Sequence, residues 1–256
     1  MECEASVLFL APTGWGKTTM LLELAKNTNK SIVYLSPLRA LANEFYLRCL
    51  QNRHRAFAPG SRKELAESLR SGLEFKLWVL TAELLYERAI EELLEDKILV
   101  FDEFHLFYYW GQDFRPALLE VYQIATLTSQ ACLLLTATAS EEVIHFWQSS
   151  TVYQERVLIN LGNQQIKKEP RSFYWTPKKQ WALNYLDLAA PGTKLVFCRY
   201  RKEAKELASQ YQEKGHKTLS CVSGEVLSFQ ENLAKIERPD FIFCTSTLSH
   251  GVNLPE

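Results

Sequence analysis

The sequence alternates short apolar runs, rich in β-branched residues, with segments of helical period. The apolar runs predict strands that begin near Val7, Ser31, Leu77, Lys97, Ala131 and Arg156. The intervening segments predict helices that begin near Lys17, Arg39, Arg62, Glu83, Phe114 and Glu141. This order is typical of βαβ units, in which helices cover a parallel sheet. Since six strands are enough for a doubly wound sheet, we predict an α/β fold.

A polar stretch interrupts the alternation, which then restarts. The stretch contains Pro170 and Pro177 and predicts a linker over residues 163–178. Beyond it we expect strands from Lys194, Lys217 and Phe241, with helices over 201–212 and 225–236. The chain is therefore expected to hold one complete domain over residues 1–162 and a similar but incomplete one over residues 179–256.

The composition excludes several classes of protein. Of the 256 residues, 47% are hydrophobic and 23% are charged, which is too apolar for a disordered chain. No apolar run approaches the roughly 20 residues of a membrane-spanning helix, so no membrane segment is expected. The acidic start, MECEAS, lacks the basic and apolar regions of a signal peptide, and we therefore expect a cytoplasmic protein.

Cysteine spacing and charge say less about function. The six cysteines stand singly, without a Cys-x-x-Cys pair, which argues against structural zinc or an iron–sulfur cluster and favours places in the core. Through Asn160 the chain has 15 Lys and Arg against 20 Asp and Glu, and from Leu161 onward it has 14 against 10. A basic second half suits a polyanionic partner, although solubility alone also explains it.

The segment APTGWGKT, residues 11–18, joins a predicted strand to a predicted helix. In this context a glycine-containing loop binds phosphate, because its backbone N–H groups and the helix N-terminus face the anion. Lys17 can reach the β- and γ-phosphates, and Thr18 can ligate Mg²⁺. Ala11 stands where the strict pattern has glycine, and a simple glycine turn is the alternative. The expected nucleotide-binding residues are Pro12, Thr13, Gly14, Trp15, Gly16, Lys17, Thr18 and Thr19.

A second motif, the acidic segment ILVFDEFH at residues 98–105, supplies the carboxylates that such a loop requires. Asp102 follows four apolar strand residues and is expected to hold Mg²⁺. Glu103 is expected to act as general base on a water that attacks the γ-phosphate. His105 taken alone is more typical of a packing or surface histidine. Lys17, Asp102, Glu103 and His105 form the candidate catalytic set.

With these two motifs, the sequence resembles the DExH-type nucleic-acid helicases of superfamily 2. Seven segments occur in the order of that family's motifs: APTGWGKT, SPLRALANE, VLTAE, VFDEFH, LLLTATA, LVFCRYRKEA and FCTSTLSHGVNLP. The resemblance extends from Val7 to Pro255, and SPLRALANE and GVNLP are most similar to the superkiller-like and related archaeal and bacterial branch. It implies two RecA-like domains with parallel sheets that close on Mg-ATP and hold a single nucleic-acid strand.

The resemblance also assigns roles to matching residues. Those implied to contact the strand are Pro37, Leu38, Arg39, Thr81, Glu83, Arg199, Ser223, Gly224, Thr245, Ser246 and Thr247. Those implied to couple His105 to domain closure are Thr136, Ala137 and Thr138. Those implied to sense the nucleotide from the second domain are Gly251 and Asn253. Each also has a purely structural alternative, such as a helix start at Arg39 or a packed strand end at Thr136.

Two departures from the family qualify this interpretation. No glutamine precedes Ala11, so the adenine-reading motif of some relatives is missing. The arginine-rich last motif expected after GVNLP is also missing, and an arginine finger contributes roughly 10³ to 10⁵ in rate. We therefore expect a fragment of a longer helicase, or part of a larger complex, that binds nucleotide and by itself hydrolyses it poorly.

Three functions follow as hypotheses. The leading one is an ATP-dependent helicase or translocase core that acts on DNA or RNA. The second is a non-catalytic, ATP-gated nucleic-acid clamp, because the arginine finger is missing. The third is a P-loop motor that acts on protein.

Overall fold

The computed structural model describes residues 5–85, 87–94, 96–150, 152–162, 192–222, 224–236 and 238–245. The chain divides into two compact units, Met1–Lys167 and Lys168–Glu256. The predicted linker over residues 163–178 lies outside the described residues.

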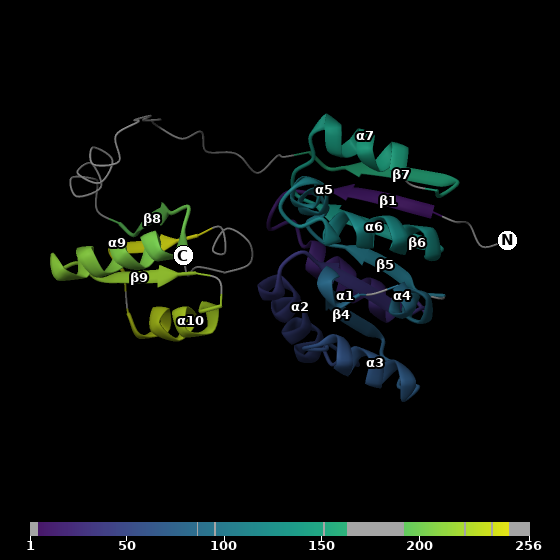
Figure 1. Ribbon diagram of the computed structural model, residues 1–256, viewed down its shortest axis with the longest axis horizontal. Helices are drawn as coiled ribbons and strands as arrows, with labels where there is room; N and C mark the ends of the chain where they lie inside the picture. Colours follow the sequence, from purple (N-terminus) through teal and green to yellow (C-terminus); the bar gives the residue numbers. More distant parts are fainter. Residues whose placement is uncertain are drawn as a thin grey trace. The chain divides into compact units, whose positions relative to one another are not determined.

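The first unit is built on a seven-stranded parallel sheet (Figure 1). Its strands are β1 (Ala5–Leu10), β2 (Ile32–Ser36), β3 (Ala56–Phe57), β4 (Leu77–Thr81), β5 (Ile98–Phe101), β6 (Ala131–Thr136) and β7 (Glu155–Asn160). They lie in the order β3-β4-β2-β5-β6-β1-β7. The six predicted strands are all present. β3 was not predicted, because two residues are too few to produce a pattern.

Helices cover both faces of this sheet. They are α1 (Lys17–Asn27), α2 (Arg39–Gln51), α3 (Arg62–Arg70), α4 (Glu87–Leu94), α5 (Phe104–Gln112), α6 (Ala117–Thr128) and α7 (Glu141–Ser150). The core residues of α1 and α2 pack with Ile32 and Tyr34 of β2. Those of α3 to α7 pack with Val33 and Leu35 of the same strand. Because successive residues of a strand face opposite layers, the doubly covered strands read as unbroken apolar runs.

Two helix predictions were wrong in detail. The helix expected near Glu83 begins at Glu87, after a short 3₁₀ helix over Ala82–Leu84. The helix expected near Phe114 is α6, which begins at Ala117 after Pro116, and α5, which starts directly after the acidic pair, was not predicted.

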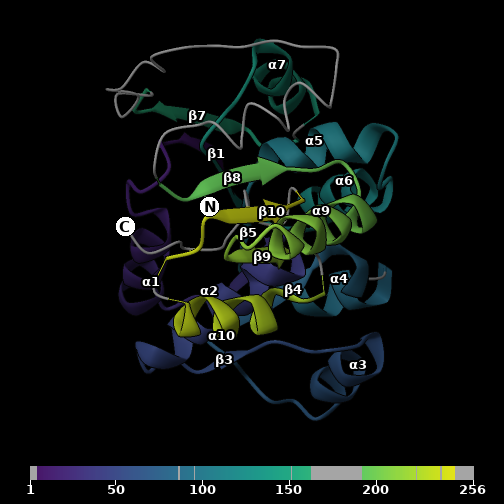
Figure 2. The same ribbon diagram turned by 90° about the vertical axis from the view of Figure 1, so that its left-hand side faces the viewer.

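The second unit contains a three-stranded parallel sheet in the order β8-β10-β9 within the part of the chain that the structure describes. Its strands are β8 (Lys194–Phe197), β9 (Thr218–Cys221) and β10 (Phe241–Cys244), and its helices are α9 (Arg201–Glu213) and α10 (Val226–Lys235) (Figure 2). Residues of α9 pack with Phe241 and Phe243, whereas those of α10 pack with Ile242 and Cys244, so the helices cover opposite faces. The predicted restart of the strand–helix alternation is confirmed.

Five of the six cysteines lie within the described residues, and these five are buried and form no disulfide: Cys49, Cys132, Cys198, Cys221 and Cys244. They occupy the core positions that were predicted for them, and Cys3 lies outside the described residues. Among the described helices, none is long and apolar enough to cross a membrane.

The close approach of α5 and α6 at Gly111 yields a stability prediction. A Cβ atom at this buried glycine would lie 2.4 Å from Cγ of Leu119, so Gly111→Ala forces the two helices apart. Although alanine is the better helix former, we expect a net destabilisation of about 1–3 kcal/mol from overpacking. Urea denaturation measures the effect. Gly60→Ala is the control, because its added Cβ meets only Glu64 Oε2 at 3.4 Å; equal stabilities of the two variants would contradict the prediction.

Candidate functional site

The loop between β1 and α1 has the backbone of a phosphate-binding loop. Ala11 is buried, and its N–H donates to the carbonyl of Thr136 at 3.0 Å, which attaches the start of the loop to β6. Gly14 and Gly16 have φ values of 79° and 103°, in the left-handed region that favours glycine. Trp15 N donates to the carbonyl of Pro12 at 3.2 Å, so the loop turns tightly before the helix begins.

The first turn of α1 is suited to an anion. It has no side-chain cap and no acidic residue, unlike α3, whose first turn is capped by the Ser61 hydroxyl. Uncapped N–H groups at a helix N-terminus attract negative charge. Lys17 begins the helix, and its Nζ donates back to the carbonyls of Ala11 at 2.9 Å and Pro12 at 3.3 Å. The predicted nucleotide residues therefore form a tight turn that ends in a lysine at an uncapped helix N-terminus, and this combination suits a polyphosphate.

Trp15 is a large exposed side chain of this loop. Its indole is 44% exposed and packs edge-on against Phe9 at the end of β1, with 5.0 Å between ring centroids. The aromatic contact connects the tip of the loop to the sheet.

Asp102 lies at the carboxyl end of β5 and is held from two directions. Its N–H donates to the carbonyl of Leu35, and the Tyr34 hydroxyl donates to its Oδ2 at 2.5 Å. Burial raises the pKa of Asp102 above its usual range, while the Tyr34 hydrogen bond and the charge of Lys17 act in the opposite direction. A carboxylate fixed in this way suits a divalent cation, and the metal role predicted for Asp102, with Thr18 of the phosphate loop, stays a prediction.

Glu103 has the properties of a base poised near neutral pH. Its backbone is left-handed, with φ 48° and ψ 49°, immediately before α5. Burial and the neighbouring Asp102 raise the pKa of Glu103 to about 7, although Lys17 opposes the shift. A carboxylate with such a pKa is matched to accepting a proton from water.

His105 connects this acidic pair to the segment after β6. Its Nδ1 lies 2.9 Å from Oγ1 of Thr136 and 3.5 Å from Oε2 of Glu103. Thr136 Oγ1 donates to the carbonyl of Thr138 at 2.7 Å, so the imidazole tautomer that completes the network carries its hydrogen on Nδ1. The structure thus brings His105 together with the predicted coupling residues Thr136, Ala137 and Thr138, whose role stays a prediction.

The two segments of the first unit that are predicted to contact the nucleic-acid strand lie at the same end of the sheet as the acidic pair. Ser36 of β2 pairs with Thr81 of β4, so the segments Pro37–Arg39 and Thr81–Glu83 lie side by side at the ends of neighbouring β-strands. The Ser36 hydroxyl donates to the carbonyl of Leu38 at 3.0 Å and shapes the turn before α2. Arg115 donates to the carbonyl of Pro37 at 2.5 Å and forms an ion pair with Glu83.

Sequence reasoning missed two residues of this site. Tyr34 carries a polar hydroxyl inside an apolar strand, and Arg115 stands between two helices, immediately before Pro116. Each pattern hints at a specific partner. Neither identifies it, because Tyr34 and Asp102 are 68 positions apart and Arg115 and Pro37 are 78 apart.

In the second unit, the described candidates follow the carboxyl ends of β8, β9 and β10. Gly224 follows β9 with a φ of 89°, and Thr245 follows β10, where its N–H donates to the carbonyl of Cys221 at 3.1 Å. Arg199 is exposed after β8, with its guanidinium 5.3 Å from the ring centroid of Tyr200. The remaining candidates of this unit lie outside the described residues: Ser223, Ser246, Thr247, Gly251 and Asn253.

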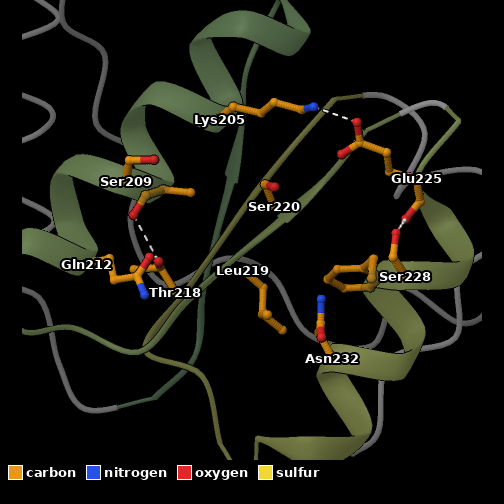
Figure 3. A pocket seen from close by; sticks show the side chains of 11 residues that line it. Lys205, Ser209, Gln212, Thr218, Leu219, Ser220, Glu225, Ser228 and Asn232 are labelled. Carbon is orange, nitrogen blue, oxygen red and sulfur yellow. Dashed lines mark hydrogen bonds and ion pairs between the residues drawn. The ribbon is translucent and has the colours of Figure 1, made fainter.

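The second unit also has a pocket of about 380 Å³ between α9 and α10 that includes none of the predicted residues. Polar side chains from both helices and from β9 line it, and an ion pair of 2.5 Å between Lys205 and Glu225 crosses one end (Figure 3).

Comparison with known proteins identifies relatives for most of the chain. Residues 2–146 match the sequence model of the DEAD/DEAH box helicase family. The chain is 26% identical over 261 residues to the probable ATP-dependent DNA helicase RecS of Bacillus subtilis, covering 96% of this chain and 53% of that protein. It is 26% identical over 237 residues to ATP-dependent DNA helicase Q5 of Mus musculus, covering 82% of this chain and 24% of that protein. The chain therefore spans about half or less of these relatives.

Solved structures share the fold. A DEAD box protein from the hyperthermophile Methanococcus jannaschii matches 98% of this chain and 72% of its own, with a TM-score of 0.50 and 17% identity. Mss116p, in a structure with single-stranded RNA and AMP-PNP, matches 100% of this chain and 60% of its own, with a TM-score of 0.57 and 14% identity. At these identities the likeness shows the RecA-like α/β fold alone.

The raised pKa of Glu103 predicts a pH-dependent stability effect. A carboxyl group with a raised pKa in the folded state stabilises the fold below about pH 4.5 and loses that contribution as the pH rises through about 7. Glu103→Gln is never charged, so between about pH 4.5 and pH 8 it should gain roughly 3 kcal/mol relative to the wild type. Urea denaturation at the two pH values measures this gain. Glu67→Gln on α3, an exposed carboxylate, is the control; an equal gain in both variants would refute the burial argument.

Proposed function

The chain belongs to the DEAD/DEAH box helicase family, and from this premise we propose that it is the ATP-dependent motor core of a nucleic-acid helicase. It would couple hydrolysis of Mg-ATP to movement along, or unwinding of, DNA or RNA. One observation carries the proposal. The phosphate loop, the Asp102–Glu103 pair, the His105–Thr136 hydrogen bond and the strand-contacting segments all lie at the carboxyl edge of one parallel sheet.

The residues at this edge have complementary chemical roles. When bound, Mg-ATP supplies a γ-phosphoryl group for transfer to water, with the metal neutralising its charge. The loop amides and Lys17 bind the phosphates, and Thr18 and Asp102 hold the metal. Glu103 orients the attacking water and accepts its proton, for which its pKa of about 7 is suited.

Strand binding is proposed to be directed at phosphates rather than bases. Binding of this kind does not depend on the base sequence, and it needs donors that face phosphates. The first unit offers backbone N–H groups, threonine hydroxyls and Arg39, and the second offers Arg199, Gly224 and Thr245. Ser223, Ser246 and Thr247 remain part of this proposed set of strand contacts, and Gly251 and Asn253 part of the proposed nucleotide sensor. Two relatives are named as DNA helicases, so single-stranded DNA is the first partner to test. We also propose a cytoplasmic location.

Substitution of Lys17 tests the motor function. In a longer version of the protein that carries the arginine-rich last motif, Lys17→Ala removes the charge that faces the phosphates, so strand-stimulated phosphate release should fall by about a hundredfold or more. Lys26→Ala, at an exposed lysine of the same helix that pairs with Glu23, is the control and should retain turnover. Phosphate release is measured with and without single-stranded oligonucleotide.

The same assay distinguishes the alternative functions. Wild-type protein that binds the strand only with ATP and releases no phosphate would be a clamp. Stimulation by neither DNA nor RNA would exclude a nucleic-acid motor and favour one that acts on protein.

Tyr34 provides a test of metal binding. Tyr34→Phe keeps the ring that stacks on Phe45 at 4.0 Å but removes the hydroxyl that orients Asp102. The Mg²⁺ concentration for half-maximal binding of a fluorescent ATP analogue should rise about tenfold. Tyr46→Phe on α2 should leave it unchanged, and an unchanged Mg²⁺ requirement in Tyr34→Phe would show that the hydroxyl does not orient the carboxylate.

A further inference from the structure

We propose that Arg115 is a positioning residue that holds the two strand-contacting segments of the first unit in a fixed relation to each other and to α5. The inference rests on the proposed function, since it concerns how the same edge of the sheet holds a strand. It also gives Glu83 a different role, as the anchor for Arg115 rather than a group that touches the nucleic acid.

Arg115 is itself firmly placed. Its N–H donates to the carbonyl of Trp110 in α5 at 2.6 Å, and its own carbonyl accepts from Leu118 N in α6 at 3.0 Å. Its guanidinium lies 5.8 Å from the ring centroid of Trp110, and Pro116 follows it. The side chain is only 23% exposed. A long side chain with its backbone and stem fixed in this way loses little further freedom when it binds its acceptors.

The guanidinium joins segments that are far apart in the sequence. Nη1 donates to the carbonyl of Pro37, in the segment after β2, and Nη2 forms the ion pair with Glu83, in the segment after β4. The planar fork of arginine presents both donors in one rigid geometry, which an ammonium group does not. Arg62 adds to this arrangement, because its Nε donates to the Glu83 carbonyl at 2.8 Å.

The charge of Glu83 supports the same role. A carboxylate on a surface that binds phosphates repels its ligand unless a cation neutralises it. Although burial by itself would raise the pKa of Glu83, the Arg115 hydrogen bond and charge lower it below its usual range. The Glu83 carboxylate is therefore ionised and paired with Arg115, and this pairing weakens the repulsion between Glu83 and the phosphates of a bound nucleic-acid strand.

The position of Arg115 also connects the strand segments to the nucleotide site. α5 begins directly after Glu103, carries His105 in its first turn and ends three residues before Arg115. Gly111 and Leu119, which flank Arg115 in the chain, approach each other closely and pack α5 against α6. A displacement of α5 at the acidic pair is therefore delivered through Arg115 to the Pro37 carbonyl and to Glu83.

Arg115→Gln tests this role by two measurements. With Mg²⁺ and a non-hydrolysable ATP analogue present, the affinity for a fluorescein-labelled single-stranded DNA of about 20 nucleotides should fall about tenfold. Hydrogen exchange should rise at the amides of residues 38–41 and 81–85. Arg70→Gln, which removes an equal charge from the exposed end of α3, is the matched control and should change neither measurement.

Two further variants separate geometry from charge. Arg115→Lys keeps the positive charge but loses the planar pair of donors, so hydrogen exchange should still rise in residues 38–41, in residues 81–85 or in both. If Arg115→Gln fails to fold, Arg115→Lys replaces it in the test. In Arg115→Gln with Glu83→Gln, the repulsion is removed but the tether is not restored, so affinity should recover only in part.

The outcomes bear separately on the two proposals. Unchanged exchange in both Arg115 variants, or full recovery of affinity in the double variant, would overturn the positioning role. Wild-type protein that binds neither DNA nor RNA would overturn the proposed function, and hydrogen exchange would still report on the tether.

Discussion

The parallel pairing of β5 between β2 and β6 fixes where the acidic pair, and with it the proposed nucleotide site, lies in this protein. Phe101 pairs with Leu35 on one side and with Leu134 on the other, so Asp102 emerges between the ends of both neighbours. Along the order β4-β2-β5-β6-β1, the edge carries in turn the two segments proposed to contact the nucleic acid, the acidic pair, the threonines proposed to couple His105 to domain closure, and the phosphate loop. These segments are far apart in the sequence, but the strand order of the folded sheet places them next to one another along one edge.

The same edge concentrates unfavourable charge. Asp102 and Glu103 are adjacent carboxylates, each partly desolvated by the apolar sheet and helices behind them. Lys17 and the Tyr34 hydroxyl stabilise the ionised forms, but they do not cancel the cost of burial. The buried acidic pair therefore lowers the folding stability near neutral pH, a cost that is common at catalytic centres and consistent with the base role proposed for Glu103.

The sequence predicted the regular parts of the fold and the backbone-defined parts of the site. Strands covered on both faces are continuous apolar runs, and a phosphate loop needs a fixed local order of glycine and lysine, so both leave a local signal. α5 was missed because FHLFYYWGQ is apolar around almost its whole circumference and shows no helical stripe. Tyr34 and Arg115 escaped because their roles depend on partners that only the folded sheet brings close.

The aromatic contact at the phosphate loop gives the molecule a built-in optical probe. Of the tryptophans in the described ranges, Trp78 and Trp147 are buried and Trp110 is half-buried, whereas Trp15 is exposed beside Gly14 and Gly16. Indole emission depends on exposure to water and on neighbouring rings, and Trp15 meets water on one side and Phe9 on the other. Its fluorescence thus reports the conformation of the nucleotide loop without any label attached to the protein.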